Sequence, residues 1–429
     1  MPAADGRANI LGLSSSSPVP HSAATAHQHR GLAPLLAALA AIGPFATDTY
    51  LPSFREIGHQ FSASPVVVQQ TLTAYMVPFA AMTLWHGAIS DALGRRKVTL
   101  ALLAGFALAS VGCMLSWSIG SLIVFRALQG MTAGAGMIIG RAIVRDVVDG
   151  TEARRLMSHI AVMFAIAPAL GPIIGGWLHV WFGWRSVFAF IALFAATLWL
   201  WCWRSLPETL PPPRRQALQA GSLLRGYWDA LRSARFVALV LSVTMNFSAV
   251  FIYIISAPAF LLGLLHVEET EFYWLFGPVT GGLLCGTWLS GRLAGRLSNR
   301  ATVALAYGFM ATAALGNFAF HTFHAATLPW SILPLVFYVL GSALAMPSLT
   351  LMALDLFPAR RGLASSCQGF VQSSGNALVT ALLAPLLWHS GLSLAGGMLT
   401  LVACGALSFG VYCWLQRHPA PRPMLNATP

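Results

Sequence analysis

The sequence contains twelve apolar stretches, and most of them are long enough to cross a lipid bilayer as a helix. A hydrocarbon core of about 30 Å requires about 20 apolar residues in an α-helix. Charged residues make up only 9% of the chain, whereas a soluble domain carries about 25% to wet its surface. We therefore expect an all-α membrane protein with twelve transmembrane helices. The runs lie at about 32–51, 66–89, 98–117, 120–140, 157–179, 185–204, 236–262, 272–291, 301–320, 327–352, 363–388 and 392–415.

A polar stretch at residues 205–235 separates the sixth apolar run from the seventh, so the runs form two sets of six. The segments after the second and eighth runs are alike, with GAISDALGRRKV starting at Gly87 and GTWLSGRLAGRL starting at Gly286. Internal repeats of this kind are typical of transporters that bind substrates between two halves. The expected organisation is a disordered cytoplasmic tail (1–31), an N-terminal six-helix bundle (32–204), a cytoplasmic linker (205–235), a C-terminal six-helix bundle (236–415) and a cytoplasmic tail (416–429).

Basic residues are unevenly distributed along the chain, and their distribution predicts an orientation. The formal net charge is +12, which would suit nucleic-acid binding in a soluble protein. However, 22 of the 25 Arg and Lys residues fall in the tails and alternate loops on one side of the membrane. Cytoplasmic loops carry such an excess. We expect a multi-pass protein of the bacterial cytoplasmic (inner) membrane, with both termini in the cytoplasm and no nucleic-acid partner.

The segment after the second run fits the pattern G-x-x-x-D-x-x-G-R-R-K and begins at Gly87. Asp91 lies at the expected inner end of helix 2, where its carboxylate can face a helix N-terminus and nearby arginines such as Arg95. Gly94 permits a tight turn. These four residues predict a conformational gate. The alternative is an ordinary turn whose basic residues only orient the chain.

Two charged residues fall inside apolar runs of the N-terminal half. Arg126 lies about six residues inside the fourth run, where an arginine costs at least about 2.5–3.5 kcal/mol. Asp48 lies near the end of the first run at a similar depth. Opposite charges at matching depth predict an ion pair whose separation would control proton binding, so we expect Asp48 and Arg126 to couple transport to protons. The alternatives are an Arg126 that extends to the interface and an Asp48 that only caps or pairs locally.

Small and helix-breaking residues interrupt the fifth run, in the segment APALGPIIGGWL. Such residues bend a membrane helix and let a neighbouring helix approach closely. The candidate packing motif consists of Gly171, Pro172, Gly175 and Gly176. A kink without functional consequence is the alternative.

Together these features resemble the major facilitator superfamily over about residues 32–415. The segments DTYLP, RALQG, RAIVRD, GPIIGG and GWRSVFAF are similar to those of its Bcr/CflA subfamily of drug:proton antiporters. The resemblance implies the major facilitator fold, a cavity lined mainly by helices 1, 4, 7 and 10, alternating access, and proton-driven efflux. GPIIGG resembles the end of the helix 5 antiporter motif of that family, in which Ser158 and Ala167 here replace expected glycines.

Aromatic, soft and a few polar side chains are expected to line a cavity that accepts varied ligands. The spacing of Asn246 and Tyr253 puts them on one face of helix 7. Hydrogen bonding and packing between helices is the alternative role for these polar residues. The candidate cavity set is Tyr50, Tyr75, Met76, Gln129, Asn246, Phe247, Tyr253 and Tyr338.

The function favoured by these features is proton-coupled efflux of amphipathic drugs or toxic organic compounds by alternating access. The alternative within transport is a proton-coupled carrier specific for one metabolite, sugar or amino acid. A membrane-embedded enzyme would need a cluster of chemical groups at one depth, and no H-E-x-x-H, nucleophile elbow or P-loop is present in the sequence. We expect no enzyme activity, no cofactor and no metal. The expected partners of this monomer are an amphipathic small molecule, protons and the lipid bilayer.

Overall fold

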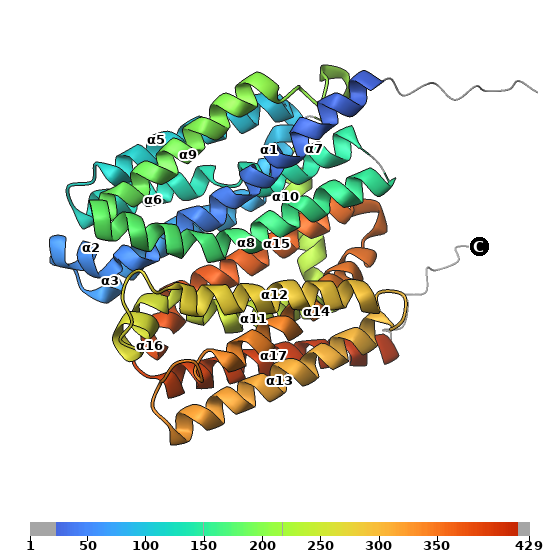
Figure 1. The fold of residues 1–429 in the computed structure, drawn as a ribbon. Coiled ribbons are helices and arrows are strands. Elements are labelled where there is room, and N and C mark those ends of the chain that lie inside the picture. The colour runs from blue at the N-terminus through green and yellow to red at the C-terminus, as the bar shows by residue number, and fades with distance from the viewer. Residues whose placement is uncertain (1–22, 149, 217, 419–429) are drawn as a thin grey trace, which may run out of the picture.

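The long helices lie side by side across the molecule in the computed structural model, which describes residues 23–148, 150–216 and 218–418 (Figure 1). No strand of a sheet occurs among these described residues. Ten helical segments are long and apolar enough to cross a membrane. The prediction of an all-α membrane protein is therefore confirmed. Most of each predicted tail, at 1–22 and 419–429, falls outside the described residues.

The N-terminal half consists of α1 to α9. Its long helices are α1 (Ala23–Asp48), α3 (Pro65–Thr83), α5 (Arg95–Met114), α6 (Ile119–Thr132), α8 (Gly150–Phe182) and α9 (Trp184–Ser205). Its short elements are η1 (Leu51–Ser53), α2 (Phe54–Gln60), α4 (His86–Leu93), η2 (Ala135–Ile139) and α7 (Gly140–Val147). The first helix begins ahead of residue 32, where the sequence predicts the first span to start. Its first residues, AATAHQ, include three alanines, and alanine is the best helix former.

The C-terminal half begins with α11, after a linker that contains η3 (Pro212–Arg214) and α10 (Ala220–Arg232). Its long helices are α11 (Ala234–Ile255), α12 (Tyr273–Leu293), α13 (Asn299–Phe323), α14 (Leu333–Asp355), α15 (Arg361–Leu378) and α17 (Gly391–Arg417). Its short elements are η4 (Pro258–Leu264), η5 (Pro358–Arg360), η6 (Val379–Leu383) and α16 (Ala384–Leu387).

Two of the twelve predicted spans, the second and the eighth, do not reach the apolarity of the other ten. Their helices are α3, with 19 residues, and α12, with 21 residues. Each is long enough for the hydrocarbon core. Gln69 and Gln70 lower the apolarity of α3, and several glycines lower that of α12. Both helices also lie at the contact between the two halves, where a helix is shielded from lipid on one side.

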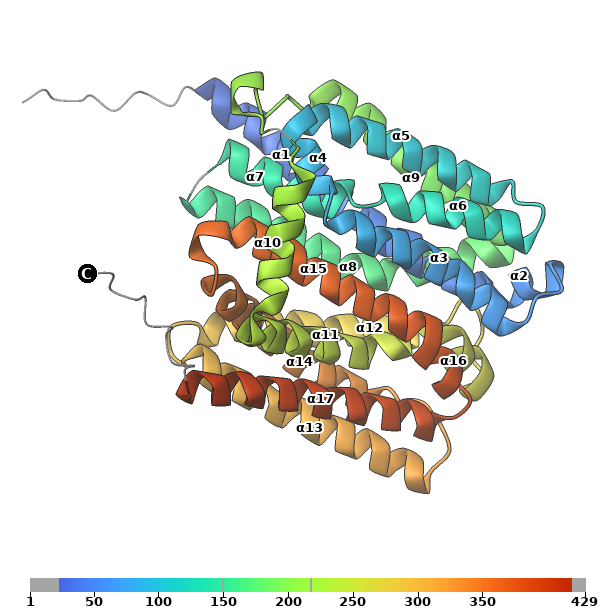
Figure 2. The ribbon, with the colours of Figure 1, turned by 180° about the vertical axis from the view of Figure 1, so that it is seen from behind.

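The two ends of the molecule are distinguished by their short helices (Figure 2). Helix α10 crosses the end at which α1 starts and α17 finishes, and we call this end the α10 face. Helices α2 and α16 lie at the opposite end, the α2 face. Between these ends the two halves touch along two pairs of helices, α3 with α15 and α8 with α12.

The fourth membrane segment is broken in the middle. Helix α6 ends at Thr132, and the π-helical turn η2 continues the chain into α7. A Cβ at Gly136 would overlap the carbonyl oxygen of Leu39, and a Cβ at Gly130 would overlap that of Tyr75. The glycines therefore bring the backbones of α1 and α3 against this segment. This close approach positions Arg126, the charged residue inside this membrane segment.

Candidate transport site

Arg126 of α6 is fully buried and lies between α1 and α3. Its Nη1 donates to the carbonyl oxygen of Ala46 at 2.9 Å and to Oε1 of Gln129 at 2.5 Å. Its guanidinium carbon lies 4.8 Å from the ring centre of Tyr50 and 4.5 Å from that of Tyr75. The faces of two aromatic rings stabilise a desolvated cation. Arg126 therefore does not extend to the membrane interface.

The Arg126 guanidinium still has unused hydrogen-bonding capacity. Its Nε and Nη2 have no partner among the described residues, and neither does the hydroxyl of Tyr75. A buried polar group without a partner costs about 1–3 kcal/mol. These groups can donate hydrogen bonds to an oxygen of another side chain, a water molecule or a substrate.

The predicted ion pair between Asp48 and Arg126 is wrong for this structure. Asp48 is buried, and its Oδ1 accepts a hydrogen bond from Oγ1 of Thr47 at 2.9 Å. Among the described residues it makes no salt bridge. A Cβ at Gly171 would lie 3.3 Å from the Cβ of Asp48, so this side chain begins against α8. Matching depth does not produce a pair here, and Arg126 instead donates to the backbone carbonyl oxygen of Ala46, two residues before Asp48.

The helix 5 glycines lie at two close contacts of α8. A Cβ at Gly175 would overlap the carbonyl oxygen of Thr49, next to Asp48 in α1. A Cβ at Gly176 would overlap the carbonyl oxygen of Glu269, which belongs to the C-terminal half. The motif therefore packs α8 against its own half and against the other half at once. Its proline, Pro172, lies inside α8.

The second contact between the halves involves α3. Nε2 of Gln70 donates to the carbonyl oxygen of Ala381 at 3.5 Å. Oγ1 of Thr380 donates to the sulfur of Met76 at 3.2 Å. Met76 thus lies at the contact between the halves, and Thr380 is a partner that the sequence did not predict. Both bonds join α3 to η6.

The predicted gate residues are brought together around Arg95, the first residue of α5. Its side chain is buried and pairs with the carboxylate of Asp91. Its Nε donates to Oδ2 of Asp146 at 2.9 Å, and its Nη1 donates to Oγ of Ser90 at 2.6 Å. Gly94 precedes it with φ of 100°, a conformation that favours glycine. Asp91 therefore binds a local arginine, and no ion pair joins it to the other half among the described residues.

Glu208 of the linker is a gate residue that the sequence did not reveal. Its Oε1 accepts a hydrogen bond from the backbone N–H of Arg95 at 2.9 Å, at the start of α5. A Cβ at Gly94 would overlap its carboxylate, while a Cβ at Gly87 would meet nothing closer than 3.8 Å. Negative charge is favoured at a helix N-terminus. The start of α5 indicated that an acidic partner should lie nearby. Because Glu208 is far from Arg95 in the sequence, the sequence did not show that Glu208 is this partner.

Three predicted cavity residues of the C-terminal half make hydrogen bonds inside that half, although Oδ1 of Asn246 has no partner among the described residues. The hydroxyl of Tyr338 donates to the carbonyl oxygen of Asn246 at 3.0 Å. Nδ2 of Asn246 donates to the hydroxyl of Tyr307 at 3.1 Å, and Nδ2 of Asn317 donates to the hydroxyl of Tyr253 at 2.7 Å. All three predicted residues are buried. Hydrogen bonding between helices, the alternative role, describes Tyr253 and Tyr338, whereas Asn246 also lines the pocket between α11 and α14.

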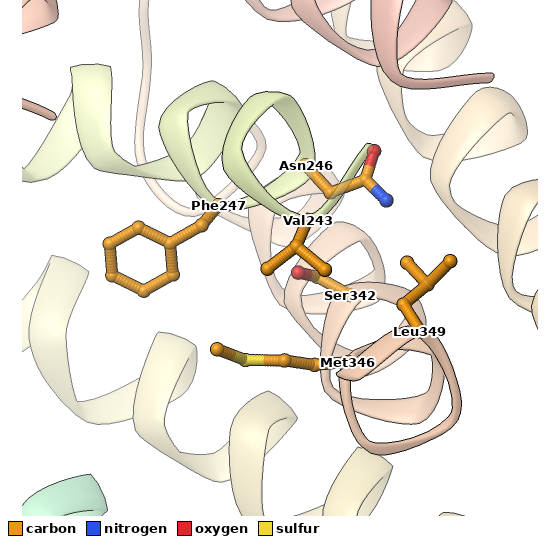
Figure 3. A pocket seen from close by; sticks show the side chains of 6 residues that line it. All are labelled: Val243, Asn246, Phe247, Ser342, Met346 and Leu349. Atoms are coloured by element: carbon orange, nitrogen blue, oxygen red, sulfur yellow. The ribbon is translucent and has the colours of Figure 1, made fainter. Parts of the chain in front are cut away.

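A narrow pocket lies between α11 and α14, and in this structure it is too small to hold a water molecule. Figure 3 shows Phe247 and Met346 extending along it, while the amide of Asn246 points away from both. Phe247 keeps its predicted place, and Met346 is a cavity residue that the sequence did not single out. The pocket is lined by Val243, Asn246, Phe247, Ser342, Met346 and Leu349.

A helical membrane protein in two halves of six long helices, with a buried cation inside one half, has the architecture that is typical of secondary transporters. The sequence profile of the Major Facilitator Superfamily matches residues 36–380. The chain belongs to this superfamily, as its motifs suggested.

Two of the three curated relatives described next carry names from drug resistance. An uncharacterized MFS-type transporter, YdgK of Bacillus subtilis (strain 168), is 32% identical over 81% of this chain and 87% of its own length. Multidrug resistance protein D of Escherichia coli (strain K12) is 26% identical, with 89% of this chain and 94% of the relative covered. The bicyclomycin resistance protein homolog of Haemophilus influenzae (strain ATCC 51907 / DSM 11121 / KW20 / Rd) is 24% identical over the same shares.

A solved structure has the same fold. It is a bacterial homolog of the human lysosomal transporter Spinster, in an inward-facing and unoccupied conformation. The likeness has a TM-score of 0.65 and covers 92% of this chain and 98% of the other. At 14% identity, it bears on the fold alone.

Proposed function

We propose that this chain is a proton-coupled antiporter that exports amphipathic organic compounds across the bacterial cytoplasmic membrane. The observation that carries the proposal is Arg126, a fully buried cation with two unpartnered donor nitrogens. An intramembrane charge is costly and is kept where it serves a pathway. The resistance proteins named above support drugs as the substrate class.

The pocket between α11 and α14 supports an amphipathic substrate. Phe247 and Met346 give it an aromatic and a soft, polarisable wall. Such side chains adapt to ligands of different shape. Since no charged residue lines this pocket, a substrate bound there would be held mainly by apolar contact.

Asp48 is the proposed proton carrier. It is buried at the end of α1, two residues after Ala46, whose backbone carbonyl Arg126 contacts. Rotation of its carboxylate towards Nε and Nη2 of Arg126 would favour the ionised form, because an adjacent cation stabilises a carboxylate. In its present position, against α8, the carboxylate makes no salt bridge among the described residues, and this is the state in which we propose that it holds the proton. Alternation between the two would bind and release one proton per cycle.

The membrane potential supplies the driving force for this exchange. It contributes about 2.3 kcal/mol per elementary charge per 100 mV.

We place both termini and the α10 face in the cytoplasm, because cytoplasmic loops are rich in Arg and Lys. Membrane-impermeant maleimide should then label Glu268→Cys, but not Ser222→Cys, in intact cells. Both positions are exposed and lie on opposite faces.

The function is tested by efflux and growth protection across a panel of toxic compounds. We expect protection against several chemically unrelated lipophilic compounds, and we expect an uncoupler of the proton gradient to abolish it. Protection against only one compound would favour the carrier specific for a single metabolite. Transport that continues in the presence of the uncoupler would refute proton coupling.

A further inference from the structure

Helix α10 rests on both halves of the protein through one of its sides. The hydroxyl of Tyr227 donates to the carbonyl oxygen of Leu84, just beyond α3, at 2.9 Å. Gly226 lies against Leu363 of α15, and a Cβ there would overlap that side chain. Burial raises the pKa of the Tyr227 hydroxyl, so it remains a donor at neutral pH. Helix α10 therefore bridges the N-terminal and C-terminal halves.

A second side of α10 is apolar but faces outward. Leu224 is 51% exposed, Trp228 is 57% exposed and Leu231 is 38% exposed. Their spacing of i, i+4 and i+7 places them in one stripe along the helix. In a helix at the edge of a membrane protein, an outward apolar stripe needs a partner other than water.

A third side of α10 is charged and adjoins the apolar stripe. Arg225, Asp229 and Arg232 are all exposed and lie one position after Leu224, Trp228 and Leu231, so this side carries two positive charges and one negative charge. The guanidinium carbon of Arg232 lies 5.1 Å from the ring centre of Trp228. Tryptophan and arginine together are characteristic of the boundary between acyl chains and head groups.

The position of α10 fits this boundary. Its buried contacts are with Leu84, at the end of the second membrane segment, and with Leu363, near the start of the eleventh. In Figure 2 the helix crosses the ends of the long helices at a steep angle to them. Helices with an apolar stripe beside arginines lie in the plane of the membrane surface. The surrounding bilayer is therefore the partner already present at this site.

We propose that α10 is an interfacial helix that lies in the head-group layer at the α10 face and binds anionic phospholipid. Leu224, Trp228 and Leu231 insert among the acyl chains, and Arg225 and Arg232 bind the phosphate groups. Because α10 contacts both halves, the bound lipid stabilises the arrangement in which Leu84 and Leu363 lie under the same helix. This inference does not depend on which substrate is transported.

The first test is lipid binding by the full-length protein, measured by native mass spectrometry with phosphatidylglycerol and phosphatidylcholine. Removal of one surface arginine should weaken binding of the anionic lipid about fivefold, and removal of two about 25-fold. We expect this loss in R225Q/R232Q. The matched control R296Q/R300Q removes two exposed arginines on the same face, one in the loop between α12 and α13 and one at the start of α13, and should retain binding. Equal binding by R225Q/R232Q and the parent would overturn the proposal.

The second test is hydrogen–deuterium exchange of residues 220–232 in nanodiscs. Exchange should be slower with phosphatidylglycerol than with phosphatidylcholine alone, and L224S/W228S should remove the difference. The thermal transition of each variant shows that the bundle is folded. Exchange that is the same in both lipids would overturn the proposal. A dimer that protects α10 equally well in detergent without lipid would do so as well, because a second copy would then be the partner.

Discussion

Gly176 of α8 lies directly against the backbone carbonyl oxygen of Glu269, so the two halves of this transporter meet at a position without a side chain. The same helix packs Gly175 against Thr49, beside the buried Asp48. A movement of the C-terminal half against α8 is therefore close, in the structure, to the proposed proton site. This relationship gives the helix 5 motif a mechanical role that can be tested.

Gly176→Ala should disfavour the state in which the halves touch at the α2 face. Overpacking against a backbone atom costs about 1–3 kcal/mol, which corresponds to a shift of about 5-fold to 150-fold in the conformational equilibrium. The distance between spin labels at His59 and Glu268, in a background without native cysteines, should lengthen. Gly281→Ala in α12 is the control, since nothing lies within 4 Å of its Cβ position. An unchanged distance in Gly176→Ala would show that this contact does not hold the halves together.

Asp48→Asn should abolish uphill efflux and proton release while the protein still folds. An amide at this position keeps a hydrogen bond with Thr47 but cannot carry a proton between states. The measurement is substrate-induced proton release from purified protein in detergent. Asp355→Asn is the matched control, because its carboxylate is half-exposed and pairs with Arg361 at 2.9 Å. If Asp48→Asn releases protons as the parent does, the proton site lies elsewhere.

Arg126→Ala should shift the pH dependence of transport and reduce substrate affinity, and Arg126→Lys should retain part of both. Lysine keeps the charge but loses the planar group that lies over Tyr50 and Tyr75. Tyr75→Phe keeps the ring and removes only a hydroxyl without a partner. Tyr75→Leu also removes the ring, with an expected loss of up to about 2 kcal/mol of cation–π stabilisation. Equal activity and stability of these two tyrosine variants would show that the ring contact does not matter.

The gate should depend on two carboxylates at the start of α5. Asp91→Asn removes the ion pair with Arg95, and Glu208→Gln removes the negative charge that faces the first N–H of this helix while keeping an oxygen that can accept from it. A favourable charge near a helix terminus contributes about 0.3–1 kcal/mol, so folding should persist. We expect Asp91→Asn to lower turnover more than substrate binding, and Glu208→Gln to have the same effect to a smaller extent. Parallel measurements of binding and transport rate distinguish this from general damage.

The fold was predictable from sequence because apolar length and turn composition are local properties. The placement of the charged residues was only partly predictable. The sequence located Asp48 and Arg126 at similar depth, but the direction of a carboxylate depends on the side of α1 from which it projects. Glu208 was missed for a related reason, because its partner Arg95 is distant in the chain and only tertiary folding brings the two together.

The polar residues of the C-terminal half show a second limit. Asn246, Tyr253 and Tyr338 lie within membrane helices, and such residues are compatible with a cavity or with bonds between helices. Their partners decide between the two roles: Asn246 and Tyr253 bind Tyr307 and Asn317 of α13, and Tyr338 binds the backbone of Asn246 in α11. By contrast, Phe247 lines the pocket through its aromatic bulk alone.

This division predicts two kinds of variant in the C-terminal half. Phe247→Ala and Met346→Ala remove side chains that line the pocket, so they should change which compounds are exported and leave thermal stability nearly unaltered. Tyr253→Phe removes the hydroxyl that accepts from Asn317 at 2.7 Å. Loss of that buried bond should lower stability by about 1 kcal/mol with the compound profile unchanged. The measurements are growth protection across the same compound panel and the thermal transition of each purified variant. A changed compound profile in Tyr253→Phe, with an intact profile in both pocket variants, would place the substrate at the buried polar network instead.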